Sequence, residues 1–122
     1  MAQAFQDLLV WQRAIEMSVS IYELTQTFPK TEVYGLTSQL RRAGVSVASN
    51  IAEGRGRLTQ GEFKQFLGLA QGSNYEVQTQ LIIVKRLMIG NPEMLGSAEK
   101  LSIEVAKMLS SLIGTLQLRA KG

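Results

Sequence analysis

The sequence contains no cysteine and no histidine. Disulfides and thiolate chemistry are therefore excluded, and a zinc site would have to be built from carboxylates alone. Histidine is the commonest general base near neutral pH, so an enzyme with this composition is left with carboxylate, lysine or tyrosine chemistry. We therefore expect no catalytic residue, no metal site and no cofactor.

Long hydrophobic runs are also lacking, and there are only two prolines. The longest charge-free runs, such as 65–75, reach about 11 residues, which is too short to span a bilayer. Residues 1–7 have no basic region before an apolar core, as a signal peptide would, so we expect a cytoplasmic protein without a membrane span. Hydrophobic residues make up 45% and charged residues 19% of the chain, which is typical of one globular domain over 1–122.

Start and stop signals predict two helices in the first half of the chain. Asp7 is a plausible N-cap for the first helix. Pro29 ends it, because the residue before a proline is pushed out of the helical region. The second helix is predicted to begin near Thr31. Gly54 and Gly56 are predicted to end it, because glycine accepts the left-handed conformation that often follows a helix.

The second half of the chain carries the same kinds of signal. Thr59-Gln60-Gly61-Glu62 is a capping box, Gly90 is a stop, and Asn91-Pro92 is typical of a helix start. The predicted helices span approximately 8–28, 31–54, 60–89 and 92–118. Because the connecting loops are short, neighbouring helices are expected to be antiparallel, in an all-α, up-down-up-down four-helix bundle.

Apolar residues exceed what one core stripe per helix requires. In the third helix the stripe is expected to include Asn74, and Gly68 and Gly72 are expected to pack tightly against the second helix. In the fourth helix the stripe is expected to be Met94, Ala98, Leu101, Val105, Met108 and Leu112. Further apolar residues lie beside the stripes, among them Trp11, Ile15, Val19, Tyr22, Tyr75, Ile82, Ile83, Leu95, Ile103, Leu109 and Leu116. A wide core face explains any one of them, but together they predict a homo-oligomer.

Positive charge is concentrated in one part of the chain. Residues 35–65 contain five basic and two acidic side chains, which accounts for the whole net charge of +3. The basic residues are Arg41, Arg42, Arg55, Arg57 and Lys64, and they are candidate contacts for the phosphates of a nucleic acid. An alternative is that the first two are one solvated arginine and one paired with a carboxylate, and that the next two only complement a helix dipole.

Polar residues lie beside the apolar stripes of the second and third helices. Asn50 and Glu53 are three residues apart and hence on one helix face, and Glu76 begins a similar polar pair. Carboxylates in neighbouring helices are typical of di-metal bundles, but those sites also require histidines. We therefore predict that Glu53 or Glu76 pairs with an arginine, such as Arg42 or Arg57, in a partly buried network.

Four segments carry a resemblance to a known family: DLLVWQRA, FPKTEVYGLTSQLRRAGVSVASNIAEGRGR, EFKQFLGLAQGSNYEVQTQL and VAKMLSSLIGTL. They resemble the four-helix-bundle proteins encoded in intervening sequences of bacterial 23S ribosomal RNA genes, over Phe5 to Leu118. The family is also similar to the accessory variability proteins of diversity-generating retroelements, which work with a reverse transcriptase and RNA. The resemblance implies a ring-like homopentamer with a basic surface, and it implies no established reaction.

The family pattern falls on a defined set of positions in this chain. This chain departs from the pattern at Gly68 and Gln71, where relatives often carry basic residues. The matching positions are Gln39, Arg41, Arg42, Ser49, Asn50, Glu53, Gly54, Gly56, Arg57, Gly72, Ser73 and Glu76. The pattern thus adds Gln39 to the candidate polar network of Asn50, Glu53 and Glu76.

Three hypotheses about function follow. The leading one is a non-enzymatic, oligomeric bundle that binds structured RNA or a nucleoprotein through the five basic residues. The alternative is a protein-interaction scaffold or adaptor, for example for a reverse transcriptase. A carboxylate-dependent enzyme using Glu53 and Glu76 is the third, and it requires the two side chains to lie within hydrogen-bonding reach.

Overall fold

The computed structural model describes residues 4–121, with side chains up to residue 119. This part of the chain contains four α-helices and no strand: α1 (Leu9–Thr25), α2 (Ser38–Arg55), α3 (Gln60–Leu87) and α4 (Pro92–Lys121). Two 3-10 turns, η1 (Phe5–Asp7) and η2 (Lys30–Glu32), and one π turn, η3 (Val33–Thr37), complete it. The prediction of an all-α protein with four helices is confirmed.

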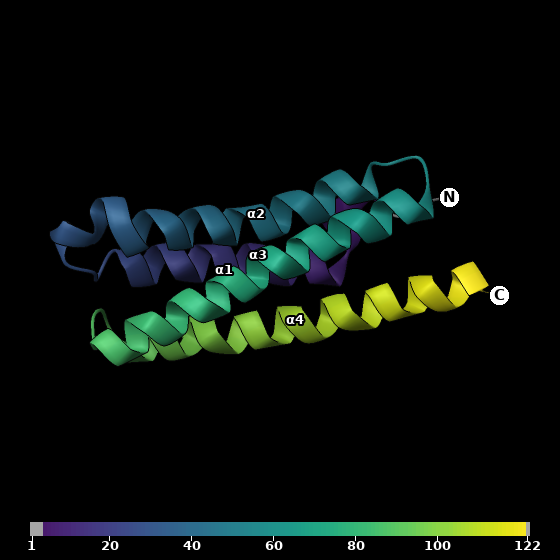
Figure 1. Cartoon of the computed structure of the whole chain (residues 1–122). Helices are drawn as coiled ribbons and strands as arrows, with labels where there is room; N and C mark the ends of the chain where they lie inside the picture. Colours follow the sequence, from purple (N-terminus) through teal and green to yellow (C-terminus); the bar gives the residue numbers. More distant parts are fainter. Residues whose placement is uncertain (1–3, 122) are drawn as a thin grey trace.

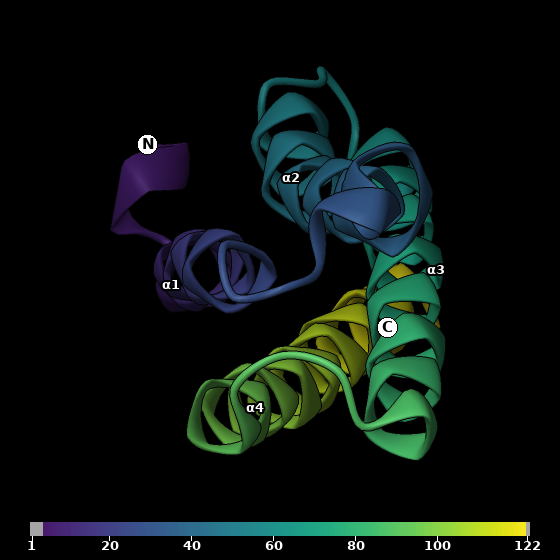
Figure 2. The same cartoon turned by 90° about the vertical axis from the view of Figure 1, so that its left-hand side faces the viewer.

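The helices occupy the corners of a square in cross-section (Figure 2), and each packs mainly against two neighbours. Figure 1 shows the α1–α2 and α3–α4 connections at one end of the molecule and the α2–α3 connection at the other. Contacts between α2 and α3 agree with the position of the connection between them. Ser46 meets Ser73 near the middle of the two helices, whereas Gly54, near the end of α2, lies against Phe66, near the start of α3.

The core lies between the four helices. Val10, Ala14, Met17, Ile21 and Leu24 of α1 are all buried, at the alternating spacing of four and three residues that the sequence predicts. Leu67, Val77 and Leu81 of α3 are equally inaccessible. Burial of these stripes provides the hydrophobic contribution to folding, at about 25 cal/mol per Å² of apolar surface removed from water.

The predicted core stripe of α4 is partly wrong. Ala98 and Val105 are buried as predicted, but Met94 is 38% exposed, and Leu101, Met108 and Leu112 are only half-buried. The buried positions of this helix are Leu95, Ala98, Ser102, Val105, Leu109 and Leu116. The prediction followed apolar residues alone, whereas a polar residue, Ser102, occupies the centre of the core-facing stripe.

Two predicted caps are present. Thr59 Oγ1 accepts a hydrogen bond from the amide of Glu62 (3.1 Å) at the start of α3. Asn91 Oδ1 accepts from the amides of Glu93 (2.9 Å) and Met94 (3.0 Å) at the start of α4. The prediction that Asp7 caps α1 is wrong. Asp7 ends the η1 turn, and the extended Leu8 takes the N-cap position without a side-chain bond.

The second helix differs most from its predicted range. α2 begins at Ser38 rather than near residue 31, because Gly35 has a non-helical backbone (φ −108°, ψ −116°). The carboxylate of Glu32 accepts a hydrogen bond from the amide of Leu36 at 3.3 Å, which begins the η3 turn. The segment before α2 is therefore helical in outline but not one continuous α-helix.

The third helix ends two residues earlier than predicted. Met88 follows it in the left-handed conformation (φ 54°) and is 88% exposed, so it does not extend the core stripe. Gly90, with φ 74°, completes the turn, and a Cβ there would lie 2.7 Å from the ring of Phe28. No helix of the described residues combines the length and apolarity needed to cross a membrane.

Candidate nucleic-acid interface

The five candidate basic residues fall into two separate groups. Arg41 and Arg42 lie near the start of α2, whereas Arg55 is its last residue, Arg57 follows in the connection to α3, and Lys64 lies near the start of α3. At 1.5 Å per residue, the fourteen residues from Arg41 to Arg55 correspond to about 21 Å along the helix. The structure thus brings Arg55 and Arg57 together at one end of the molecule and leaves Arg41 and Arg42 apart from them.

Arg41 is engaged by α1. Its Nε donates a hydrogen bond to Thr25 Oγ1 at 2.8 Å, and its guanidinium lies 4.4 Å from the centroid of the Tyr22 ring. Thr25 is buried and donates in turn to the carbonyl of Ile21 (2.8 Å). Arg42 is exposed and has no hydrogen bond or ion pair with any described residue. The alternative of one solvated arginine and one paired with a carboxylate is therefore half right: Arg42 is solvated, but Arg41 contacts a threonine hydroxyl and a tyrosine ring rather than a carboxylate.

Arg57 is held on the outside of the α2–α3 corner. It forms an ion pair with Glu53 at 3.6 Å, and its guanidinium lies 4.5 Å from the centroid of the Phe66 ring. The predicted pairing of Glu53 with an arginine is present, but the predicted partly buried network is not, because this pair lies on the surface. Both side chains are largely exposed, so solvent screens the attraction and the pair contributes little to stability.

Arg55 and Lys64 are half-buried and have no ion-pair partner within the described part of the chain. The guanidinium of Arg55 lies 5.4 Å from the centroid of the Phe63 ring. Its Nε is buried and makes no hydrogen bond with any described residue. A buried guanidinium donor normally has an acceptor, so this atom is unusual.

Arg119, near the end of α4, is a basic residue outside the set of five candidates. The structure places it beside Arg55 and Arg57, around one cavity at the end of the molecule where α3 begins and α4 ends. No local pattern could have indicated this grouping, because Arg119 lies 62 residues after Arg57. A prediction of the helix order combined with the helix lengths would have been required.

The four candidate residues of the polar network do not meet. Gln39 accepts a hydrogen bond from Gln80 Nε2 at 3.3 Å. Asn50 Nδ2 donates to the carbonyl (2.9 Å) and to the hydroxyl (3.0 Å) of Ser46, one turn earlier in α2. Glu76 is exposed and has no partner among the described residues. The network is therefore divided among separate pairs along the α2–α3 contact.

The carboxylates of Glu53 and Glu76 also lie apart. The hydroxyls of Ser46 and Ser73, 2.9 Å from each other, mark one level of the α2–α3 contact. Glu53 lies seven residues beyond this level toward one end, and Glu76 lies three residues beyond it toward the other. This separates their backbones by about 15 Å along the helices. No cluster of three metal-ligating side chains occurs in the described chain.

Sequence reasoning missed the buried polar pairs between α3 and α4. Asn74 Nδ2 donates to the carbonyl of Ser102 at 2.9 Å, and Ser102 Oγ donates to Asn74 Oδ1 at 2.8 Å. One helical turn earlier in α3, Gln71 Nε2 donates to the carbonyl of Ala106 and to Ser110 Oγ, each at 3.0 Å. These bonds fix the register of α3 against α4 inside the core.

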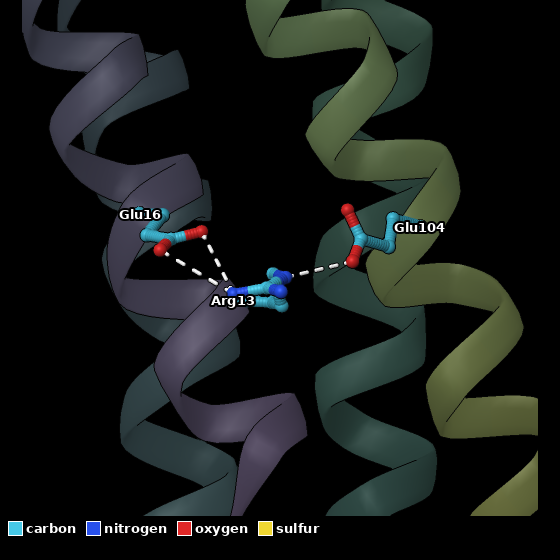
Figure 3. Close-up of polar contacts among 3 residues, drawn as sticks. All are labelled: Arg13, Glu16 and Glu104. Carbon is cyan, nitrogen blue, oxygen red and sulfur yellow. Dashed lines mark hydrogen bonds and ion pairs between the residues drawn. The ribbon is translucent and has the colours of Figure 1, made fainter.

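A second missed contact joins α1 to α4. Arg13 Nε donates to Glu104 at 2.7 Å, and Glu16 accepts from the same guanidinium at 3.3 Å (Figure 3). The hydrogen bond that Arg13 donates to Glu104 and the charge of Glu16 raise the pKa of Arg13 above its ordinary value. All three residues lie on the surface, so the arrangement positions the two helices rather than forming a site.

The expectation that Gly68 and Gly72 pack tightly against α2 is wrong. A Cβ added at either position would meet nothing within 4 Å. The close approach of α2 and α3 occurs instead at Gly54, where a Cβ would lie 2.5 Å from Phe66 Cβ. Gly68 and Gly72 thus face away from the core, on the open side of α3.

These observations define an all-α protein of four helices with two basic groups and, among the residues described, no converging catalytic or metal-binding side chains. The family model for 23S rRNA-intervening sequence proteins matches residues 6–111, and the chain belongs to that family. A similar crystal structure is that of a protein of unknown function from the S23 ribosomal protein family of Bacteroides thetaiotaomicron. It is 25% identical with a TM-score of 0.75, and the match covers 86% of this chain and 98% of that one. Comparison with curated proteins gave no significant match.

Proposed function

We propose that this protein is a non-enzymatic, oligomeric RNA-binding bundle of the cytoplasm that contacts phosphates through its two basic groups. One observation carries the proposal. Of the five cations in residues 35–65, only Arg57 has an ion-pair partner among the described residues. The net charge of the chain thus remains available to an external polyanion. The names of the family and of its structural neighbour point to ribosomal RNA genes and ribosomal proteins, which suits an RNA ligand.

Binding of this kind is mainly electrostatic and independent of base sequence. Lysine and arginine that neutralise phosphates release condensed counterions, so the affinity falls steeply with salt. Phosphate contacts position the nucleic acid, while sequence is read from base edges. The five cations lie near the ends of α2 and α3, which pack within the bundle, rather than along one helix that could enter a groove. We therefore propose recognition of backbone charge rather than of sequence.

The proposal includes assembly of up-down-up-down bundles into a ring-like homopentamer. An apolar groove between α1 and α2 supports it. Trp11, Ile15 and Val45 line this groove. A neighbouring hollow, lined by Tyr22 and Val33, also contains Arg41 and Arg42 and is left open to RNA in the proposal. Val19, on the same side of α1, is 55% exposed. Such a surface is typical of contacts between subunits.

A filter-binding assay with structured RNA at low salt tests RNA binding. The variant Arg42→Gln/Lys64→Gln/Arg57→Gln removes three charges from the two groups. The matched control Arg86→Gln/Lys100→Gln/Lys107→Gln removes three exposed charges elsewhere. We expect the first variant to lose at least about tenfold in affinity, as three fewer phosphate contacts imply, and the control to lose much less. Equal losses in both variants, or no binding by the wild type, would overturn the proposal.

The same apolar groove also favours a second candidate function, an adaptor that binds a protein such as a reverse transcriptase. The resemblance to accessory variability proteins motivates this candidate. A pull-down that recovers a stoichiometric protein partner after nuclease treatment, and loses it on Val45→Glu, would support the adaptor. Retention of that partner only while RNA is intact would favour direct RNA binding instead.

A further inference from the structure

One cavity is lined by more arginines than the other surface hollows described. It lies where the α2–α3 connection, the start of α3 and the end of α4 meet, and has a volume of about 550 Å³. Arg55, Arg57 and Arg119 contribute to its wall, and no aspartate or glutamate does. Ligand pockets in proteins are commonly about 300–1,000 Å³. The cavity therefore has the size and the sign of charge for a small anion-bearing ligand.

A donor without an acceptor lies in this wall. Arg55 Nε is buried and has no hydrogen-bond partner among the described residues. The nearest hydroxyl on the α2–α3 connection, that of Thr59, is already used. It accepts from the amide of Glu62 and donates to the Glu62 carboxylate at 3.2 Å. An acceptor brought by a ligand would satisfy the Arg55 donor.

The start of α3 adds to the attraction for an anion. Gln60 and Gly61 are the first residues of this helix, and their amides have no carbonyl one turn earlier to bond. The aligned peptide dipoles place a partial positive charge at the same point. The three arginines add positive charge to this end of the cavity. Two nearby carboxylates are already bonded within the protein: Glu53 pairs with Arg57, and Glu62 accepts from Thr59.

The rest of the wall is apolar. Phe63 lies under the guanidinium of Arg55, and Leu112 and Leu116 of α4 line the cavity with it. A bare inorganic anion would leave this surface in contact with water. A ligand that joins an anionic group to a flat, weakly polar ring would cover it, because rings stack on aromatic faces and on guanidinium planes.

We propose that this cavity binds the phosphorylated terminal nucleotide of an RNA, with the phosphate at Arg55 and Arg119 and the base against the apolar wall formed by the exposed Leu58 and the half-buried Leu112. The inference rests on the proposed function and specifies its ligand. A terminal phosphate monoester carries about −1.5 to −2 charges at pH 7, whereas an internal phosphodiester carries one. Arginines without carboxylates favour the more highly charged group, and the cavity volume suits one nucleotide rather than a continuous strand.

Fluorescence anisotropy tests the inference with two RNA oligonucleotides of the same sequence, one with a 5′-phosphate and one with a 5′-hydroxyl. We expect the full-length wild type to bind the phosphorylated RNA at least about tenfold more tightly, a difference of about 1.4 kcal/mol. The preference is expected to disappear in Arg55→Gln and in Arg119→Gln. It is expected to persist in the control Arg86→Gln, which removes an exposed charge at the far end of α3. Arg119 is exposed, so its variant tests the inference even if Arg55→Gln does not fold.

Calorimetry with adenosine 5′-monophosphate and with inorganic phosphate separates this inference from the proposed function. Equal affinity for the two RNAs overturns the cavity site but leaves RNA binding in place. Failure to bind either RNA, together with Arg55-dependent binding of the mononucleotide, supports the cavity for a free nucleotide and overturns RNA binding. Binding of inorganic phosphate as tightly as the mononucleotide overturns the role assigned to the apolar wall. Absence of binding to all four ligands overturns both proposals.

Discussion

Asn74 of α3 and Ser102 of α4 hold each other by two hydrogen bonds in the fully buried centre of the protein. Asn74 Nδ2 donates to the Ser102 carbonyl at 2.9 Å, and Ser102 Oγ donates to Asn74 Oδ1 at 2.8 Å. Both residues have no exposed surface. Burying a polar group without a hydrogen-bond partner costs free energy of folding. Each of these two side chains supplies the partner that the other needs in the core.

Asn74→Ala is therefore expected to lower the free energy of unfolding by about 2–3 kcal/mol, because it leaves the Ser102 hydroxyl unpaired and opens a small cavity. Urea unfolding followed by circular dichroism measures this change. Thr79→Ala on the exposed face of α3 is the control, and it should change the free energy by less than about 0.5 kcal/mol. Equal effects of the two substitutions would contradict the role given to the pair.

Asn74→Asp should make stability depend on pH. Burial disfavours the charged form and so raises the pKa of the new carboxyl group above its value in the unfolded chain. The folded state then binds more protons than the unfolded state between the two values, so stability falls as pH rises through this window. We expect the variant to be less stable than the wild type at pH 7 and to recover part of the loss at pH 4. A constant difference at both pH values would contradict the prediction.

Alanine substitutions at Gly54 and at Gly72 are expected to change the free energy of unfolding in opposite directions. A Cβ at Gly54 would lie 2.5 Å from Phe66 Cβ, so Gly54→Ala should force α2 and α3 apart and cost about 1–3 kcal/mol. A Cβ at Gly72 meets no atom, so Gly72→Ala should stabilise the helix by up to about 1 kcal/mol. Thermal or urea unfolding of the two variants makes the comparison. Destabilisation by Gly72→Ala would indicate that another subunit covers this part of α3.

Substitution of Arg41 should lower the stability of the protein, whereas substitution of the adjacent Arg42 should weaken RNA binding. Arg41→Met removes the hydrogen bond to Thr25 and the contact with Tyr22, at a cost of about 1–2 kcal/mol in the free energy of unfolding. Arg42→Met should change this free energy by less than about 0.5 kcal/mol, because its side chain is exposed. It should instead weaken RNA binding and reduce the salt dependence by about one counterion. Identical RNA affinities of Arg42→Met and the wild type would remove Arg42 from the interface.

Light scattering after size-exclusion chromatography tests the proposed ring. Five copies of a 13.4 kDa chain have a mass of about 67 kDa. Val19→Glu places a charge in the α1–α2 groove and is expected to shift the protein toward the monomer without loss of helical signal, because burying an unpaired charge is costly. Ile103→Glu, at a similarly exposed apolar residue of α4, is the comparison. Dissociation by Ile103→Glu but not by Val19→Glu would exclude the groove as the interface.

The fold was predictable because its determinants are local. The stripe of α1, the cap at Thr59 and the cap at Asn91 each depend on residues a few positions apart, and each is present. The start of α2 was not predictable, because one non-helical glycine, Gly35, interrupts a segment whose composition suits a helix. Similarly, glycines at Gly68 and Gly72 are compatible with either tight packing or an open face, and the sequence does not distinguish the two.

The candidate site was less predictable because it depends on residues far apart in the chain. Ser102 was overlooked because its partner, Asn74, lies 28 residues away and only the pair explains its burial. Arg13 and Glu104 are separated by 91 residues. The five cations of residues 35–65 suggested one surface, but α2 converts their separation in sequence into separation in space. Arg119 joins one of the resulting groups only through the packing of α4.

The length of α2 sets a minimum size for an RNA that uses both basic groups. The phosphates of one strand in a duplex advance about 3.4 Å per nucleotide, so the roughly 21 Å between the ends of this helix corresponds to about six nucleotide steps. A fragment of three or four nucleotides can reach one group only. Affinity should therefore rise with RNA length in two stages, first as one end of the helix is occupied and again when the strand becomes long enough to reach the other.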